Sequence, residues 1–85
     1  MHQIQIYIDG EWHPFYGMGL GLEKNCERYR QIRTALRKKG IVYPCRLVGV
    51  SSLEEMGVLG ARMYENQMSY PEIGDLFTNK SDISL

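Results

Sequence analysis

Gly17-Met18-Gly19-Leu20-Gly21 is a glycine-rich segment that leads directly into LEKNCERYRQIRTALRKKG, the residues from Leu22 to Gly40. The second part predicts an amphipathic helix, because its apolar residues recur at the spacing of one helical face. That predicted apolar stripe consists of Leu22, Cys26, Tyr29, Ile32 and Leu36. Lys38 and Lys39 suit the negative end of a helix dipole, and Gly40 suits the left-handed position just past the helix end. We therefore expect a glycine-rich loop followed by a helix that ends near Gly40.

The residues before this stretch predict a β-hairpin. Residues 3–8 alternate between isoleucine and polar or aromatic side chains, as a half-buried strand does. Asp9-Gly10 follows directly, and this pair favours a two-residue turn in which both residues have positive φ. The second strand is expected from Glu11 to about Tyr16. Pro14 favours an edge position for this strand, because proline has no backbone N–H to donate.

The residues after the basic helix predict one more strand and one more helix. Residues 41–50 are rich in the β-branched side chains typical of a strand. Ser51 and Ser52 are candidate caps for a helix from about Leu53 to Gln67. Pro71 must end that helix by the residue before it.

The predicted order of strand, strand, helix, strand, helix belongs to the α+β class. We expect a two-layer sandwich, in which a three-stranded antiparallel sheet with the order 2-1-3 carries both helices on one face. Residues 1–78 are expected to form a single domain, in which residues 72–77 dock as a short turn. Residues 79–85 are expected to form a flexible C-terminal tail.

Length and composition restrict the class of protein further. Eighty-five residues suit one domain, and 44% apolar residues provide for one compact core. A core of this size is marginal by itself, so we expect a homo-oligomer. No apolar run is long enough to span a bilayer, the first residues do not resemble a signal peptide, and cysteines are few. These features predict a cytoplasmic protein without a membrane partner.

The net charge of zero conceals an uneven distribution of charge. Residues 24–46 contain eight basic residues and one acidic residue, which gives a local charge of +7. Residues 54–85 contain six acidic and two basic residues, a local charge of −4. Such a polarised chain can steer an anionic partner to one face. Alternatively, the acidic half can lie over the basic helix, or the charges can simply be solvated.

Arginines on the predicted basic helix form the first candidate site. Arg30, Arg33 and Arg37 recur at i, i+3 and i+7, so they should lie in a line on one side of the helix. Guanidinium groups suit phosphate and carboxylate alike. The candidate binding residues are Arg28, Arg30, Arg33, Arg37 and Lys38. The expected partner is anionic: a nucleic acid, a nucleotide phosphate or an acidic protein surface. Overall neutrality falls short of the basic balance of a dedicated nucleic-acid binder.

The glycine-rich segment is the second candidate site. A loop between a strand and a helix N-terminus can bind phosphate through free backbone N–H groups. The residues of this candidate are Gly17, Gly19, Gly21 and Lys24. The pattern matches neither G-x-G-x-x-G nor a P-loop, and Glu23 would repel a phosphate. A flexible or tightly turned connection without a ligand is the interpretation that the low specificity of this pattern favours.

The sequence contains no catalytic or metal-binding signature. Cys26 lies on the predicted apolar stripe, where cysteine usually behaves as a small hydrophobic residue. His2, His13 and Cys45 lack the paired short spacings of a zinc site. We therefore expect a protein that is not an enzyme and that needs no cofactor or metal.

The predicted second helix is a candidate interface. Its glycines weaken an isolated helix, which suggests that another backbone approaches there, and methionine surfaces adapt to several partners. The residues of this candidate are Met56, Gly57, Gly60, Met63 and Tyr64. Core packing explains the same pattern. The sequence thus predicts a small non-enzymatic binding module or inhibitor that acts through its arginine-rich helix. The alternative is a structural or adaptor protein that self-associates, or binds another protein, through the second helix.

Overall fold

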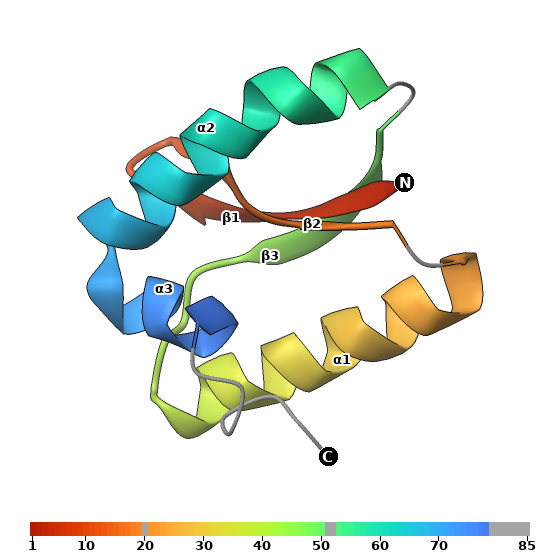
Figure 1. Ribbon diagram of the computed structural model, residues 1–85. Helices are drawn as coiled ribbons and strands as arrows, with labels where there is room; N and C mark the ends of the chain where they lie inside the picture. The colour runs from red at the N-terminus through yellow and green to blue at the C-terminus, as the bar shows by residue number, and fades with distance from the viewer. Residues whose placement is uncertain (20, 51–52, 79–85) are drawn as a thin grey trace.

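A computed structural model describes residues 1–19, 21–50 and 53–78, and it describes side-chain surroundings for all of these except 53–59 and 78 (Figure 1). The candidate caps Ser51 and Ser52 and the predicted tail 79–85 lie outside the described residues. The elements are β1 (His2–Ile8), β2 (Glu11–Met18), α1 (Leu22–Lys38), β3 (Cys45–Gly49), α2 (Leu53–Ser69) and α3 (Pro71–Thr78).

The three strands form one antiparallel sheet in the order β2-β1-β3, which confirms the predicted α+β class and strand order. The hairpin turn is also as predicted, since Asp9 has a φ of 52° and Gly10 a φ of 83°. The β1–β2 register shifts between Ile4 and Gln5, and β2 continues to Met18, two residues beyond the expected end.

The core lies between one face of the sheet and two helices, α1 and α3. Ile4, Ile6 and Ile8 are almost fully buried on this face, as their alternation in the sequence predicts. The other members of the core come from β2, α1 and α3: Phe15, Met18, Ile32, Ala35, Leu36, Ile73, Leu76 and Phe77. Figure 1 shows both helices on the same side of the sheet. The segment expected to dock as a short turn is therefore the helix α3, and it closes the core.

The position of α2 corrects the expectation that the two predicted helices share one face. Two helices do share a face, but they are α1 and α3, whereas α2 lies across the strands from them and packs along β2 (Figure 1). Asn66 donates a hydrogen bond of 2.8 Å from its Nδ2 to the Pro14 carbonyl, and Gln67 donates one of 2.6 Å from its Nε2 to the Phe15 carbonyl. These two bonds satisfy strand carbonyls that do not face β1, so α2 covers the outer edge of β2.

The inward face of α1 differs from the predicted stripe at its N-terminal end. Leu22 is 63% exposed, because the first turn of α1 extends beyond the end of the sheet (Figure 1). Asn25 is buried instead, and its amide nitrogen lies 2.8 Å from Nδ1 of His2 on β1. Farther along the helix, Ile32 and Leu36 are buried as predicted.

The C-terminal end of α1 is as the sequence predicts. Gly40 has a φ of 76°. Its N–H bonds the Arg37 carbonyl at 3.0 Å, and the Ile41 N–H bonds the Leu36 carbonyl at 2.9 Å. This pair of bonds is a Schellman motif, which requires a left-handed residue that glycine adopts at little cost.

Candidate anion-binding site

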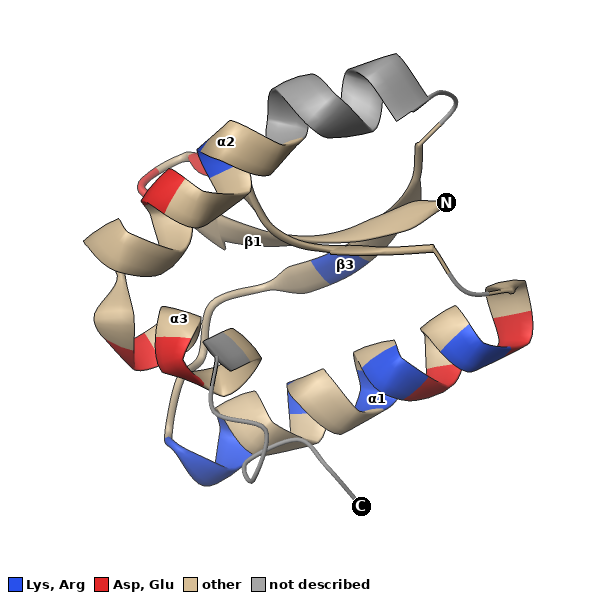
Figure 2. Cartoon of the chain, viewed as in Figure 1, with Lys and Arg blue, Asp and Glu red and all other residues tan. Residues whose placement is uncertain are grey.

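Exposed cations line α1, as the spacing of its arginines predicts. Arg30, Arg33, Arg37 and Lys38 are exposed, whereas Arg28 is half-buried. Figure 2 shows mainly Lys and Arg along α1, with some acidic residues on the same helix, whereas Asp and Glu appear on α3 and the hairpin turn and both signs of charge appear on α2. We call Arg30, Arg33, Arg37 and Lys38 the cationic face of α1.

These cations are not neutralised by the acidic half of the described chain. Among the side chains of residues 1–19, 21–50 and 60–77, neither Arg30 nor Arg33 nor Arg37 forms an ion pair with an Asp or Glu. Glu72 and Asp75 on α3 are exposed. The described residues therefore do not show the predicted alternative in which the acidic half lies over the basic helix. The cationic face remains available to another molecule.

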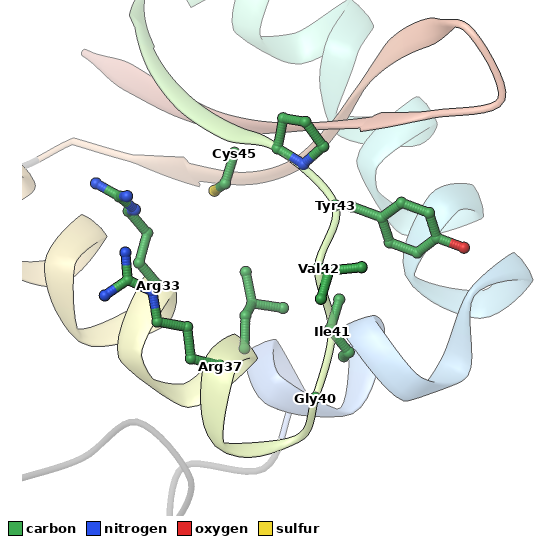
Figure 3. Close-up of a pocket in the computed structure, with 9 residues that line it drawn as sticks. Arg33, Arg37, Gly40, Ile41, Val42, Tyr43 and Cys45 are labelled. Carbon is green, nitrogen blue, oxygen red and sulfur yellow. The ribbon is translucent and has the colours of Figure 1, made fainter.

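A pocket of about 400 Å³ adjoins the C-terminal half of this face. It is lined by Arg33, Leu36, Arg37 and residues 40–45. Figure 3 shows the two arginines on the α1 side, while the ring of Tyr43 points away from them. The sequence predicted a strand here, but β3 begins only at Cys45, and residues 41–44 form a loop in which Ile41 packs against the core and Val42 is 90% exposed.

Tyr29 and Arg33 join α1 to the first residue of β3. The Tyr29 hydroxyl donates a hydrogen bond of 2.6 Å to the Cys45 carbonyl, and the Arg33 guanidinium lies 5.6 Å from the centre of the Tyr29 ring. Burial raises the pKa of Tyr29 and raises that of the Cys45 thiol to about 11. Cys45 is therefore a neutral, weakly reactive thiol near pH 7. The hydrogen bond from Tyr29 connects α1 to the start of β3.

We expect Cys45 to resist alkylation at pH 8. A pKa about two units above the ordinary 9.0 leaves about a hundredfold less thiolate, and the thiolate is the reactive form. The measurement is the iodoacetamide labelling rate of the Cys26→Ala variant, followed by mass spectrometry. The rate should rise between pH 9 and pH 11. Because folding raises the pKa of the Cys45 thiol, the protonated thiol contributes to the free energy of unfolding below about pH 9. This contribution is lost as the pH rises from about 9 to about 11. Equal labelling rates for folded and urea-unfolded protein at pH 8 would contradict this.

The glycine-rich segment is shorter than predicted. Gly17 belongs to β2, where it lies opposite Gln3, so it is not part of a loop. Gly19 and Lys24 are exposed, and Gly21 precedes α1 with an extended backbone, φ −64° and ψ 162°. Its carbonyl accepts the first helical bond from Asn25. The only described glycines with positive φ are Gly10 and Gly40, so Gly19 and Gly21 do not have the left-handed geometry common in anion-binding backbone nests.

The predicted interface on α2 is only partly described. The side-chain surroundings of Met56 and Gly57 lie outside the described residues, Met63 is half-buried, and Tyr64 is 67% exposed. A Cβ at Gly60 would meet no described atom within 4 Å, so no other described backbone of this chain approaches there, and an approach by a partner stays a prediction. Within the described chain, a close backbone approach occurs at Gly74 on α3, where Gln67 of α2 lies against it.

An aromatic cluster on the second face of the sheet was missed from the sequence. The Arg46 guanidinium lies 4.1 Å from the centre of the Trp12 ring, and its Nε donates a hydrogen bond of 2.8 Å to Oε1 of Gln5. Tyr7 lies edge-on to Trp12 at 5.2 Å. The two-residue turn at 9–10 places Tyr7 opposite Trp12, so this pair was predictable, but the contribution of Arg46 from β3 depends on tertiary register.

In the part of the chain that the structure describes, no three His, Cys, Asp or Glu side chains gather as metal ligands would. Among its helices, none combines the length and apolar composition needed to cross a bilayer. Comparison with protein families, curated proteins and solved structures found no match for this chain.

Proposed function

We propose that this chain is a small non-enzymatic binding module, or inhibitor, that engages an anionic partner through the cationic face of α1. The observation that carries this proposal is the exposure of Arg30, Arg33 and Arg37 in one line, with no ion pair to any described acid. Guanidinium groups bind carboxylate and phosphate oxygens in a planar fork. The module would act by occupying its partner's surface.

The position of the charges supports this kind of binding. Helical residues seven apart lie about 10 Å apart along the axis, so the three arginines can contact several anionic groups of one ligand. Because the acids lie mainly on other elements, the molecule is polarised and can orient an approaching anion (Figure 2). The net charge of zero argues for a partner of limited size over a long nucleic acid.

Changing Arg30, Arg33 and Arg37 together to glutamine is expected to abolish most of the binding. The measurement is fluorescence anisotropy with labelled oligoglutamate, single-stranded DNA and a nucleoside triphosphate at several salt concentrations. Wild-type protein should bind at least one of these probes with an affinity that falls as salt rises. For DNA, each lost phosphate contact should flatten the log–log salt slope by about 0.7–0.9.

The single variant Arg33→Gln is compared with Arg62→Gln as its control. Each change removes one positive charge from an exposed helical position. Arg33→Gln should weaken binding more than Arg62→Gln does. Unchanged affinity and salt dependence in the triple variant would exclude the proposed role of α1.

Exposed apolar side chains on α2 favour a second candidate function. Tyr64 and Met68 are 67% and 66% exposed, an unusual amount for large apolar groups unless a partner covers them. We propose, as the alternative, a structural or adaptor protein that forms a homo-oligomer or binds another protein through α2. Binding that survives the triple arginine change would favour this alternative.

A further inference from the structure

The outer edge of β3 is open in the described structure. The Tyr7 N–H bonds the Pro44 carbonyl at 2.9 Å, and the Val50 N–H bonds the Met1 carbonyl at 2.8 Å. In an antiparallel pair the bonded residues alternate, so the even-numbered residues of this segment face β1. The N–H and C=O groups of Leu47 and Gly49 therefore point away from the sheet, and no described residue bonds them there.

The two edges of the sheet are treated differently. The β2 edge is covered by α2 through the amides of Asn66 and Gln67. The β3 edge has one charged residue, Arg46, and a charged side chain can protect an exposed edge. However, the Arg46 guanidinium reaches across β1 to lie over Trp12 of β2. The Arg46 side chain therefore covers the second face of the sheet, and it does not shield the backbone N–H and C=O groups at the β3 edge.

The Cys45 end of this edge is positively charged. At its first residue, Tyr29 already satisfies the Cys45 carbonyl, and Arg33 lies against the Tyr29 ring. Arg33 and Arg37 both line the pocket that ends at Cys45 (Figure 3). Residues four apart on a helix are about 6 Å apart along its axis, and alternate residues of a strand are about 6.7 Å apart. In a segment that continues past Cys45 toward residues 41–44, acidic residues at alternate positions would thus match the two arginines.

We propose that β3 accepts an extended acidic segment of a partner protein as a fourth strand. Leu47 and Gly49 would bond the backbone of this segment, while Arg33 and Arg37 would bind its carboxylates. The inference rests on the proposed function of α1 and names its partner class. A nucleic acid can satisfy the arginines, but it has no peptide backbone to continue the ladder.

The test uses a synthetic ten-residue peptide of alternating Glu and Thr, a twin with N-methylated alternate amides, and a single-stranded oligonucleotide. The variants are Gly49→Pro, which removes the outward N–H, and Gly49→Ala, which keeps it. A Cβ at Gly49 meets nothing within 4 Å, so the two variants differ chiefly in this donor. We expect Gly49→Ala to bind the peptide as wild type does, and Gly49→Pro to bind it roughly tenfold more weakly. The methylated twin should also bind weakly to wild-type protein, a result that does not depend on the folding of any variant.

Hydrogen exchange followed by NMR completes the test. The Leu47 and Gly49 amides should exchange more slowly when the peptide is bound. Peptide binding without this protection, equal binding of the methylated twin, or binding of the oligonucleotide alone would overturn the added strand while leaving the role of α1 intact. Protection that rises with protein concentration in the absence of peptide would assign the edge to a second copy of the chain and overturn the proposal. If no probe bound, both proposals would fall.

Discussion

Replacing Gly74 by alanine is expected to destabilise the protein by about 3 kcal/mol. A Cβ built at Gly74 overlaps the Gln67 carbonyl oxygen and lies 2.8 Å and 2.9 Å from the carbonyl carbon and Cα of Gln67. These are backbone atoms of α2, which no rotamer change can move aside. The added methyl group must therefore push α3 away from α2, and Leu76 and Phe77 would leave their places in the core.

Urea denaturation of Gly74→Ala beside Gly60→Ala measures this effect. Gly60 lies in the interior of α2 and has room for a Cβ, so alanine there should gain up to about 1 kcal/mol through helix propensity. The two identical changes should therefore shift the unfolding midpoint in opposite directions. A Gly74→Ala variant as stable as wild type would show that α3 does not cross α2 as closely as described.

Replacing Leu36 by alanine is expected to cost roughly 2–5 kcal/mol. Leu36 is 3% exposed and packs in the core between α1 and the sheet. The change removes buried apolar surface and leaves a cavity that the surroundings can only partly fill. In a domain whose whole stability is about 5–15 kcal/mol, the loss leaves the fold marginal.

The matched control is Leu22→Ala on the same helix. Leu22 is 63% exposed, so its replacement should change the free energy of unfolding by less than about 0.5 kcal/mol. Both variants make the same chemical change, and only the burial of the side chain differs. Equal melting temperatures for the two variants would mean that α1 presents a different face to the sheet.

The sheet and the end of α1 could be predicted from the sequence because local chemistry determines them. The alternation of Ile4, Ile6 and Ile8 places one face in the core whatever packs on it. Asp9-Gly10 and Gly40 supply the positive φ angles that the turn and the helix end require. None of these features depends on a distant contact.

The arrangement of the helices could not be predicted because it depends on contacts between distant residues. The amides of Asn66 and Gln67 reach β2 across more than fifty residues of sequence, and nothing near them in the chain indicates this. Leu22 fits the helical period, but its exposure depends on where the sheet ends. The sequence does not distinguish Gly60 from Gly74. Only the crossing of α3 over α2 requires a glycine at position 74.

Some features of the candidate site could likewise be predicted from local sequence, whereas others depend on contacts between distant residues. The i, i+3, i+7 spacing predicts the line of arginines, and the structure exposes it. The attachment of Arg33 to β3 passes through Tyr29 and Cys45, which lie sixteen residues apart. The open edge at Leu47 and Gly49 follows only from the β1–β3 register.

The proposed binding role of α1 is tested most directly by NMR chemical-shift mapping of the wild-type protein. The probe is the acidic Glu-Thr peptide, titrated into isotope-labelled protein at low salt. The largest shifts should appear at the side-chain Nε–H groups of Arg30, Arg33 and Arg37 and at the backbone amides near them, and they should reverse when salt is added. Shifts concentrated on α2 around Tyr64, or arginine resonances that stay in place at a saturating peptide concentration, would contradict the proposed role of α1.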